Sequence, residues 1–392
     1  MSRLLIRDGC VLTLDNKIGN HRRADLLVED GVITEIGPNL RARNAEVIDA
    51  TDCIVMPGFV DTHRHLWESL FRRHDGIGDP TALGAHYSAD DVYAATLAGL
   101  LGAIEAGITT VVDWAQVRSE HLDAAIQAHI DAGLRAVLVH ALPAWADENW
   151  TAAAGSLVAR PAHPHIRFDV APPAGTGDVE RAASEWGHAG SLGLRVHAHI
   201  GASRSEQGAA AALGSAGLLG PDVTLVHCSS LGDADFDAIA AAKAGVVIAP
   251  AAEMVMGHEP PPVQRMIDRG LRPGLATGPE RLGPGDIFAP MRAAISVQHA
   301  TYFDLKLAGK GGLPNLLTTR EVIRYATIDG ARAVGVDGIT GTLSPGKQAD
   351  LIVLRADRPN IAPINDPIGA VVWGMDTSNL DWVVAGGAIL MR

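Results

Sequence analysis

The feature that most constrains this chain is an eightfold alternation of short apolar runs with helical segments between Pro57 and about residue 330. Apolar runs of this length are typical of buried parallel strands. The expected strands span residues 59–63, 108–113, 134–140, 166–171, 194–200, 223–228, 246–249 and 271–276. Eight alternating β and α units predict a (β/α)8 barrel. A doubly wound open sheet is the alternative, but it usually has fewer strands, and no GxGxxG motif follows the first strand.

Start and stop signals bound the helical segments. Residues 88–106 open with Ser88-x-x-Asp91, which resembles a capping box, and close at Gly107. The two ends of the chain differ from this middle, because they contain alternating strands separated by turns such as Asp30-Gly31. Expected strands there span residues 4–6, 11–14, 25–29, 32–36, 47–49, 350–354, 370–373 and 382–390. Two all-β ends are therefore predicted to flank the barrel.

Composition excludes several classes of function. The chain has 392 residues and a formal net charge of −13, so its field would repel a nucleic acid. Its three cysteines are widely spaced and odd in number, which favours a reducing compartment over a disulfide framework. No apolar run approaches the roughly 18 residues of a membrane span. We expect a cytoplasmic protein with no membrane partner.

Histidines gather where the expected strands end. The chain has 16 histidines, and the active site of a barrel lies at the carboxyl ends of its strands. His63 and His65 end the first strand, His197 and His199 the fifth, and His227 the sixth. One such histidine is more often a hydrogen-bonded core residue than a ligand, but several at one rim favour a metal site. Histidines elsewhere are expected to be solvated or at the opposite mouth: His21, His74, His121, His129, His163, His165, His188 and His299.

Three segments resemble the amidohydrolase superfamily, in particular its cytosine deaminase and triazine hydrolase branch. They are residues 57–65 (PGFVDTHRH), 107–113 (GITTVVD) and 341–351 (GTLSPGKQADL). The resemblance runs nearly end to end, and the first and third segments together are highly specific. It implies a metal-bearing barrel, residues 58–338, beside a composite β-sandwich built from residues 1–57 and 339–392. Relatives of this kind often form homo-oligomers, so self-association is an outcome that the sequence leaves open.

The resemblance also implies a site and a reaction. It assigns the metal ligands His63, His65, His199 and His227, the last either binding the ion or holding the water that the ion activates. Relatives with two ions bridge them with a lysine at the fourth strand, and none of the five lysines lies near a strand end. We therefore expect one divalent ion, Zn²⁺ as first choice with Fe²⁺ as the alternative. The implied reaction is hydrolysis of a C–N bond, by deamination or amide or ring cleavage, in a small nitrogen-containing, cyclic compound.

Two positions depart from the family pattern. The Glu that deaminases of this branch carry three residues after the fifth-strand histidine is Ala202, and the Asp that ends the eighth strand is Gly278. Loss of a general base commonly costs a factor of about 10² to 10⁴ in rate. Three readings stay open. Glu280 or Glu253 supplies the carboxylate, or His227 does the proton work alone, or the protein is a non-hydrolytic member that binds a small molecule or catalyses an isomerase-like or lyase-like step.

Several side chains are candidates for substrate contacts. Glu68, three residues after His65, could accept hydrogen bonds from substrate N–H groups, although a solvated Glu at a helix start explains it equally well. Rim tryptophans could stack on a planar ring or simply pack in loops. The full set of candidate substrate contacts is Glu68, Trp67, Trp114, Trp145, His197 and His258.

Overall fold

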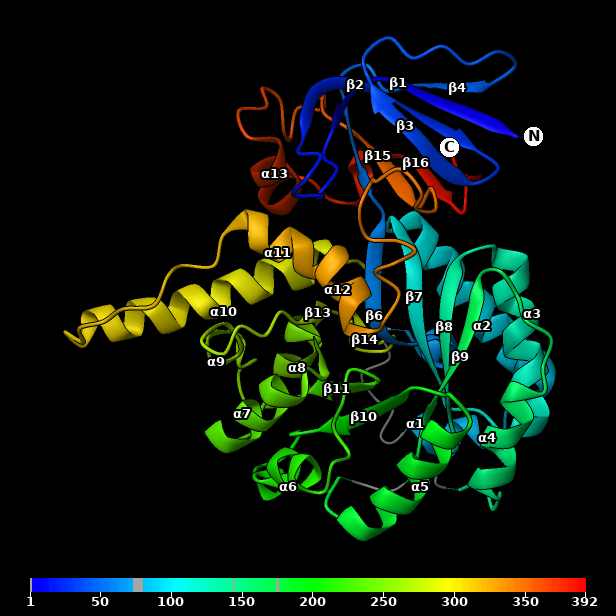
Figure 1. Ribbon diagram of the computed structural model, residues 1–392, viewed down its shortest axis with the longest axis vertical. Coiled ribbons are helices and arrows are strands. Elements are labelled where there is room, and N and C mark those ends of the chain that lie inside the picture. The colour runs from blue at the N-terminus through cyan, green and yellow to red at the C-terminus, as the bar shows by residue number, and fades with distance from the viewer. Residues whose placement is uncertain (1, 73–79, 144, 174–175) are drawn as a thin grey trace.

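A computed structural model describes residues 2–72, 80–143, 145–173 and 176–392, and His74 lies outside these ranges. Figure 1 shows a lower barrel with its helices and an upper sheet that contains both chain termini. The upper sheet takes its strands from both ends of the chain. We propose domain boundaries near residues 57 and 339, where the chain passes between the two sheets.

The lower sheet is wholly parallel and follows the order β13-β12-β11-β10-β9-β8-β7-β6-β14. Its last two segments are the halves of one eighth strand, since β13 pairs with β12 and β14 pairs with β6. The sheet therefore closes into the barrel that the eightfold alternation predicts. Its strands are β6 (Phe59–His65), β7 (Ile108–Ala115), β8 (Arg135–Ala141), β9 (Ile166–Ala171), β10 (Val196–Ile200), β11 (Val223–His227), β12 (Gly245–Ile248), β13 (Gly274–Leu275) and β14 (Gly278–Pro279).

Helices surround this sheet, and their caps match the signals in the sequence. Ser88 and Asp91 form the expected capping box of α2, and Gly133 ends α3 with a left-handed φ of 76°. The helices are η1 (Leu66–Phe71), α1 (Pro80–Gly84), α2 (Ala89–Glu105), η2 (Ser119–His121), α3 (Leu122–Ala132), α4 (Trp150–Val158), α5 (Val179–Ser191), η3 (Arg204–Glu206), α6 (Ala209–Ser215), α7 (Asp233–Ala242), α8 (Pro250–Val255), α9 (Val263–Ile267), α10 (Phe288–Leu307), α11 (Thr319–Tyr325) and α12 (Ile328–Ala333).

The upper sheet has the order β17-β16-β15-β5-β1-β2-β3, with β4 paired to β1. Its strands are β1 (Arg3–Val11), β2 (His21–Glu29), β3 (Val32–Gly37), β4 (Glu46–Asp49), β5 (Cys53–Pro57), β15 (Leu351–Arg355), β16 (Leu380–Ala385) and β17 (Ala388–Met391). Three sequence expectations differ from the structure here. Strand β5 was not expected, and the strand expected over residues 11–14 is not formed, because Val11 ends β1. Residues 370–373 are helical, in η4 (Ala370–Gly374), which continues from α13 (Pro367–Gly369). Asp366 caps α13, so an Asp-Pro helix start outweighs the apolar run. A further short helix is η5 (Thr377–Asn379).

The two sheets are joined by packing as well as by the chain. Strand β5 leads through Gly58 directly into β6, and the buried ion pair of Arg135 with Asp350 (2.8 Å) connects the start of β8 to the start of β15. Apolar side chains such as Ile352 and Leu380 belong to the same buried cluster as the core around the barrel. The upper sheet therefore forms part of the barrel's support.

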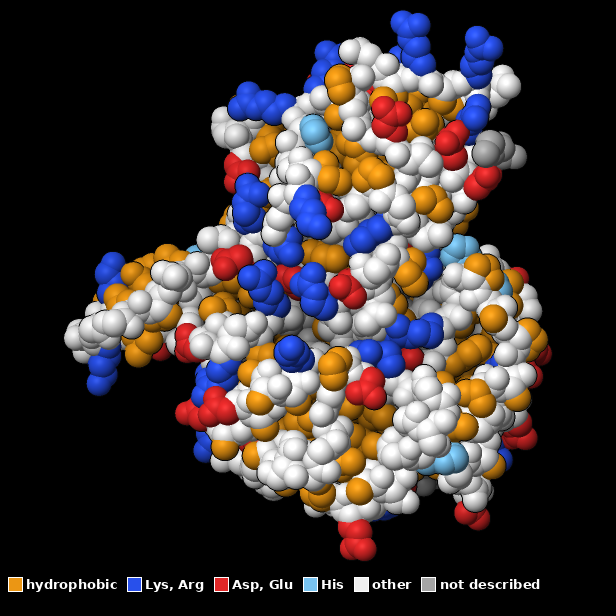
Figure 2. Space-filling model, viewed as in Figure 1, with side chains coloured by type: hydrophobic (Ala, Val, Ile, Leu, Met, Phe, Trp, Pro, Cys, Tyr) orange, Lys and Arg blue, Asp and Glu red, His pale blue; other side chains and the backbone are white. Residues whose placement is uncertain are grey.

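The far end of α10 projects from the body (Figure 1). Hydrophobic side chains gather on this projection in Figure 2, where Phe303 is 45% and Leu307 85% exposed. Among the described residues, no helix combines the length and the apolar character that crossing a membrane would require.

Candidate active site

Strand β6 supplies the first two histidines of the site. Residues two apart on a strand face the same side, so His63 and His65 both turn toward the barrel mouth. Their Nε2 atoms lie 3.0 Å apart. The intervening Arg64 points to the opposite side, where it binds Glu280. Alternation along a single strand thus separates a histidine pair from a buried arginine.

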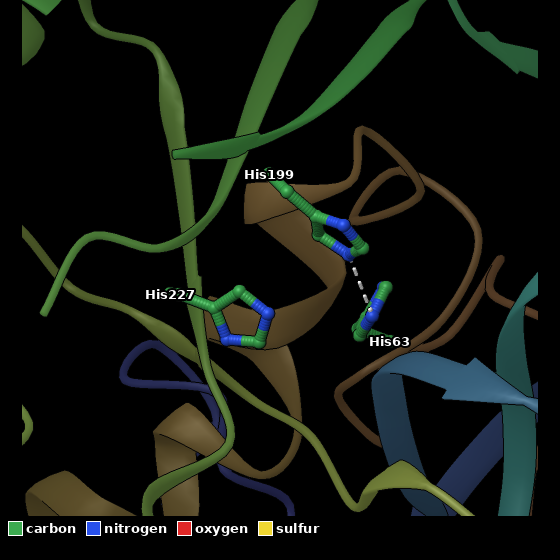
Figure 3. Close-up of side chains that lie close together, drawn as sticks. All are labelled: His63, His199 and His227. Atoms are coloured by element: carbon green, nitrogen blue, oxygen red, sulfur yellow. Dashed lines mark hydrogen bonds between the residues drawn. The ribbon is translucent and has the colours of Figure 1, made fainter. Parts of the chain in front are cut away.

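His199 on β10 and His227 on β11 complete the cluster. Nε2 of His199 lies 3.1 Å from Nε2 of His63. One ring nitrogen from each of His63, His199 and His227 lies within 4.8 Å of the others, and Figure 3 shows the three rings converging. His227 adopts a positive φ of 80°, a backbone conformation that is costly for a residue with a side chain. Such strain is common at functional sites.

Burial disfavours the protonated form of His63, His65 and His199. It holds the pKa of His63 and of His199 well below the usual range, and neighbouring histidines lower both further. The same cause lowers the pKa of His65 to about 3. A neutral imidazole offers a lone pair to a metal ion, whereas a protonated one does not. The cluster is thus ready to bind a cation at neutral pH.

Glu253, the first acidic residue of α8, contacts the cluster directly. Its side chain is fully buried, and Oε1 lies 2.9 Å from Nδ1 of His227. The backbone N–H of Ala249 donates to the same oxygen at 2.8 Å. Because a carboxylate can only accept, Nδ1 of His227 carries the proton and its Nε2 presents a lone pair. Glu253 is therefore a hydrogen-bond partner of His227.

Two aromatic rings lie against the histidines. Trp114 at the end of β7 stacks on His199, with ring centroids 4.2 Å apart and planes 11° apart. His258 meets His227 edge to face at 5.1 Å. Both candidates thus border the site, although Trp114 rests on a ligand histidine and is itself almost fully buried.

The position of the missing aspartate is filled by the chain itself. Gly278 has a φ of +79°, and a Cβ added there would lie 3.1 Å from the Cβ of Ala252 and 3.4 Å from that of Ala249. These two alanines belong to the segment that presents Glu253. The structure therefore places α8 over the point where an eighth-strand side chain would emerge.

Glu280, one of the two carboxylates considered as a substitute base, belongs to a buried ion network with two arginines. Its carboxylate accepts from Arg64 at 2.6 Å and from Arg72 at 2.7 Å. Arg64 is 1% exposed and also pairs with Asp61, which binds Thr277 of the eighth strand. The positive φ of Gly278 interrupts the strand's alternation, so a residue two positions on faces another side. Sequence reasoning missed this buried network, and only the i,i+3 spacing of Asp61 and Arg64 hinted at it.

His197, a candidate substrate contact, is buried in a pair with an aspartate. It is 1% exposed, and Nε2 lies 2.9 Å from Asp169 of β9. His197 lies two residues nearer the N-terminal end of β10 than His199, and therefore beneath the histidine cluster at the barrel mouth. His129, expected to be solvated, is also buried and lies 3.0 Å from Asp113.

The remaining candidates lie around the rim. Trp67 is 2% exposed and packs edge to face on Tyr87, which indicates loop packing. Glu68 is buried beside it in η1. Trp145 is half-buried, with the Arg118 guanidinium 5.9 Å above its ring. The roles of these three side chains toward a substrate stay proposals. His165 lies against Gly386 of the upper sheet, as expected for the opposite mouth.

The residues of the cluster fit one divalent ion. Two nitrogen ligands of a tetrahedral zinc ion lie roughly 3.3 Å apart, close to the 3.0 and 3.1 Å separations here. All five lysines belong to the described part of the chain, and none of them lies at the carboxyl end of a barrel strand. The fourth strand, β9, offers Asp169 in a pair with His197 instead. The donor set is thus one of imidazoles around a single position.

Comparisons with known proteins agree with this geometry. Residues 54–389 match the model of the Amidohydrolase family. The 5'-deoxyadenosine deaminase of Methanosarcina acetivorans is 28% identical, covering 100% of this chain and 93% of the relative. The 5-methylthioadenosine/S-adenosylhomocysteine deaminase of Desulforudis audaxviator is also 28% identical, with 100% and 94% covered. An adenosine deaminase from Xanthomonas campestris with bound zinc shares the fold, with a TM-score of 0.86, 20% identity, and 100% and 93% covered.

Proposed function

Because the chain belongs to the amidohydrolase family, we propose that it is a metal-dependent hydrolase of C–N bonds in small cyclic compounds. The observation that carries this proposal is the convergence of ring nitrogens from His63, His199 and His227 within 4.8 Å. We propose His65 as the fourth member of the ligand set, since its Nε2 lies 3.0 Å from that of His63. Zinc is the preferred ion, because it suits imidazole ligands in a tetrahedral arrangement.

A bound divalent ion would supply an acidified water and polarise the substrate. The chain's own residues do the rest. Glu253 keeps the proton of His227 on Nδ1, so that the lone pair of Nε2 would be directed at the bound ion. Trp114 fixes the ring of His199 by stacking on it. His258 lies against His227 at the rim, where an incoming substrate would meet it.

The substrate class that we propose is an amino-substituted nitrogen heterocycle, with adenine nucleosides lacking a 5'-hydroxyl as the first examples to test. Support comes from the two kinds of deaminase that this chain resembles over its whole length. The absence of the family carboxylate at Ala202 is the reason to test a range of leaving groups. That acid would protonate the substrate and leaving group in the deaminases of this branch, so compounds with better leaving groups depend on it less.

The test combines metal analysis with a substrate screen. We expect protein purified without added metal to contain about one divalent ion per chain. We expect zinc-loaded protein to release ammonia, or another small leaving group, from at least one aminated heterocycle. His63→Asn and His199→Asn should lose the ion and the activity together, whereas His299→Asn on α10 should retain both.

A stoichiometry near zero would contradict the metalloenzyme. An ion bound stoichiometrically without turnover of any heterocycle would favour the alternative, a non-hydrolytic member of the family. That alternative is motivated by Gly278 and Ala202, which leave two family carboxylate positions without an acid.

A further inference from the structure

Glu253 differs in its position along the chain from the active-site Asp that the family resemblance implies. Among the described residues, it is the carboxylate that directly contacts one of the four clustered histidines. It comes from α8, after the seventh strand, whereas the family resemblance places the corresponding Asp at the end of the eighth. Its Oε1 accepts from both His227 and Ala249, and its Oε2 has no hydrogen-bond partner among the described residues.

Gly278 and Glu253 are linked by packing. The Cβ of any larger residue at position 278 would lie 3.1 Å from Ala252, the residue before Glu253. Such a contact is tighter than ordinary packing, and the backbone there is in the left-handed region, φ +79°. An Asp on the eighth strand would therefore be strained in its backbone and would require α8 to move by a few tenths of an ångström. Loss of the side chain at 278 makes room for the helix that brings in Glu253.

We propose that Glu253 is a positioning residue that replaces the missing eighth-strand Asp. It holds His227 in the tautomer whose Nε2 lone pair faces His63 and His199. Carboxylate partners of this kind orient histidine ligands and commonly change metal affinity or activity by a factor of about 10 to 100. Oε2 of Glu253 is buried and accepts no hydrogen bond from a described residue. Because an unpaired buried oxygen is costly, we expect it to accept a hydrogen bond from water or substrate. This inference rests on the proposed function, because it assigns a role to Glu253 at the same site.

Two variants and a matched control test the proposal. In E253A, zinc affinity measured by competition with a chromophoric chelator should fall by a factor of about 10 to 100. In E253Q the loss should be smaller, because the amide oxygen can still accept from Nδ1–H of His227. Met254→Ala, on the same helix and 44% exposed, should bind zinc like the wild type. Where a substrate is known, kcat should fall in E253A with KM little changed.

A second readout does not depend on the metal. Nitrogen-15 NMR of histidine-labelled, zinc-free protein should show His227 as the Nδ1–H tautomer in the wild type and in E253Q. In E253A this tautomer of His227 should be lost. Far-UV circular dichroism checks that each variant folds. If E253A does not fold, the wild-type spectrum carries the test, because an Nε2–H tautomer at His227 would overturn the proposal. Unchanged tautomer populations and zinc affinity in a folded E253A would overturn the proposal. A wild type with the expected tautomer but without zinc affinity would instead overturn the proposed function alone.

Discussion

At the residue scale, the make-up of the histidine cluster depends on which face of a strand each side chain occupies and on its depth in the barrel. The i,i+2 spacing of His63 and His65 predicted a shared direction, and the structure brings them together. The same spacing does not bring His197 and His199 into one cluster. His197 lies one layer deeper in the barrel, where it pairs with Asp169. The i,i+2 spacing shows which face of a strand a side chain occupies, but not how far that side chain lies from the barrel mouth. The sequence could therefore predict the histidine cluster, but it could not show that His197 lies beneath it.

Gly278 offers a sharp test of the packing between the eighth strand and α8. We expect Gly278→Asp not to restore a family-like acid but to lower both stability and zinc affinity. The left-handed backbone costs a residue with a side chain about 1 to 2 kcal/mol, and the clash with Ala252 adds to that. Urea unfolding of the zinc-free variant measures the loss.

Gly187 is the matched control for that substitution. It lies within α5, and a Cβ added there would meet nothing within 4 Å. Gly187→Ala should therefore be neutral or stabilising, by up to about 1 kcal/mol. A Gly278→Asp variant as stable as the wild type, with higher activity, would show that α8 moves readily and that the eighth-strand acid still suits this site.

At the element scale, the alternation of strands and helices was enough to predict the barrel. All eight predicted strands exist, because buried parallel strands read as apolar runs and capped helices separate them. The errors lie where tertiary contacts decide. Residues 370–373 look like a strand but follow a capped Asp366-Pro367 turn into a helix. Glu280 looked like a substitute base because Gly278 was assumed to continue the strand.

The buried pair of Arg64 and Glu280 connects the first strand to the segment after the eighth. We expect Arg64→Met to destabilise the protein by about 3 to 5 kcal/mol, because it leaves Glu280 and Asp61 without their buried cation. Urea unfolding of the zinc-free protein provides the measurement. The double variant with Glu280→Gln should recover part of the loss, because the buried carboxylate that keeps only the part-exposed Arg72 as its partner is then removed.

A surface pair provides the comparison for Arg64. Arg204 pairs with Glu259, but its side chain is 79% exposed. Arg204→Met should change the free energy of unfolding by less than about 1 kcal/mol, since solvent screens exposed ion pairs. Equal effects of the two substitutions would mean that the buried network around Arg64 contributes no more than a surface contact.

At the scale of the whole molecule, one of the buried apolar clusters contains side chains of both the barrel and the upper sheet. Some buried histidines lie away from the proposed metal site. His140 on β8 is 3% exposed, and its Nε2 lies 3.3 Å from the carbonyl oxygen of Val117. Burial lowers the pKa of His140, and burial also lowers that of His197. Unfolding exposes both rings to water, where a histidine titrates near pH 6.5. The protonation of buried histidines therefore couples the stability of the whole protein to pH.

The sign of this coupling follows from which state binds more protons. Between the lowered pKa values of the folded protein and about 6.5, the unfolded chain holds protons that the folded one excludes. Stability is therefore full above pH 6.5 and is lost as the pH falls below it, by up to about 1.4 kcal/mol per pH unit for each such histidine. Urea unfolding of zinc-free protein between pH 7.5 and 5.5 should show this decline. In His140→Gln the decline should be shallower than in the wild type. An equally steep decline in His140→Gln would mean that the pH dependence arises from other groups, because the substituted residue no longer takes up a proton on unfolding.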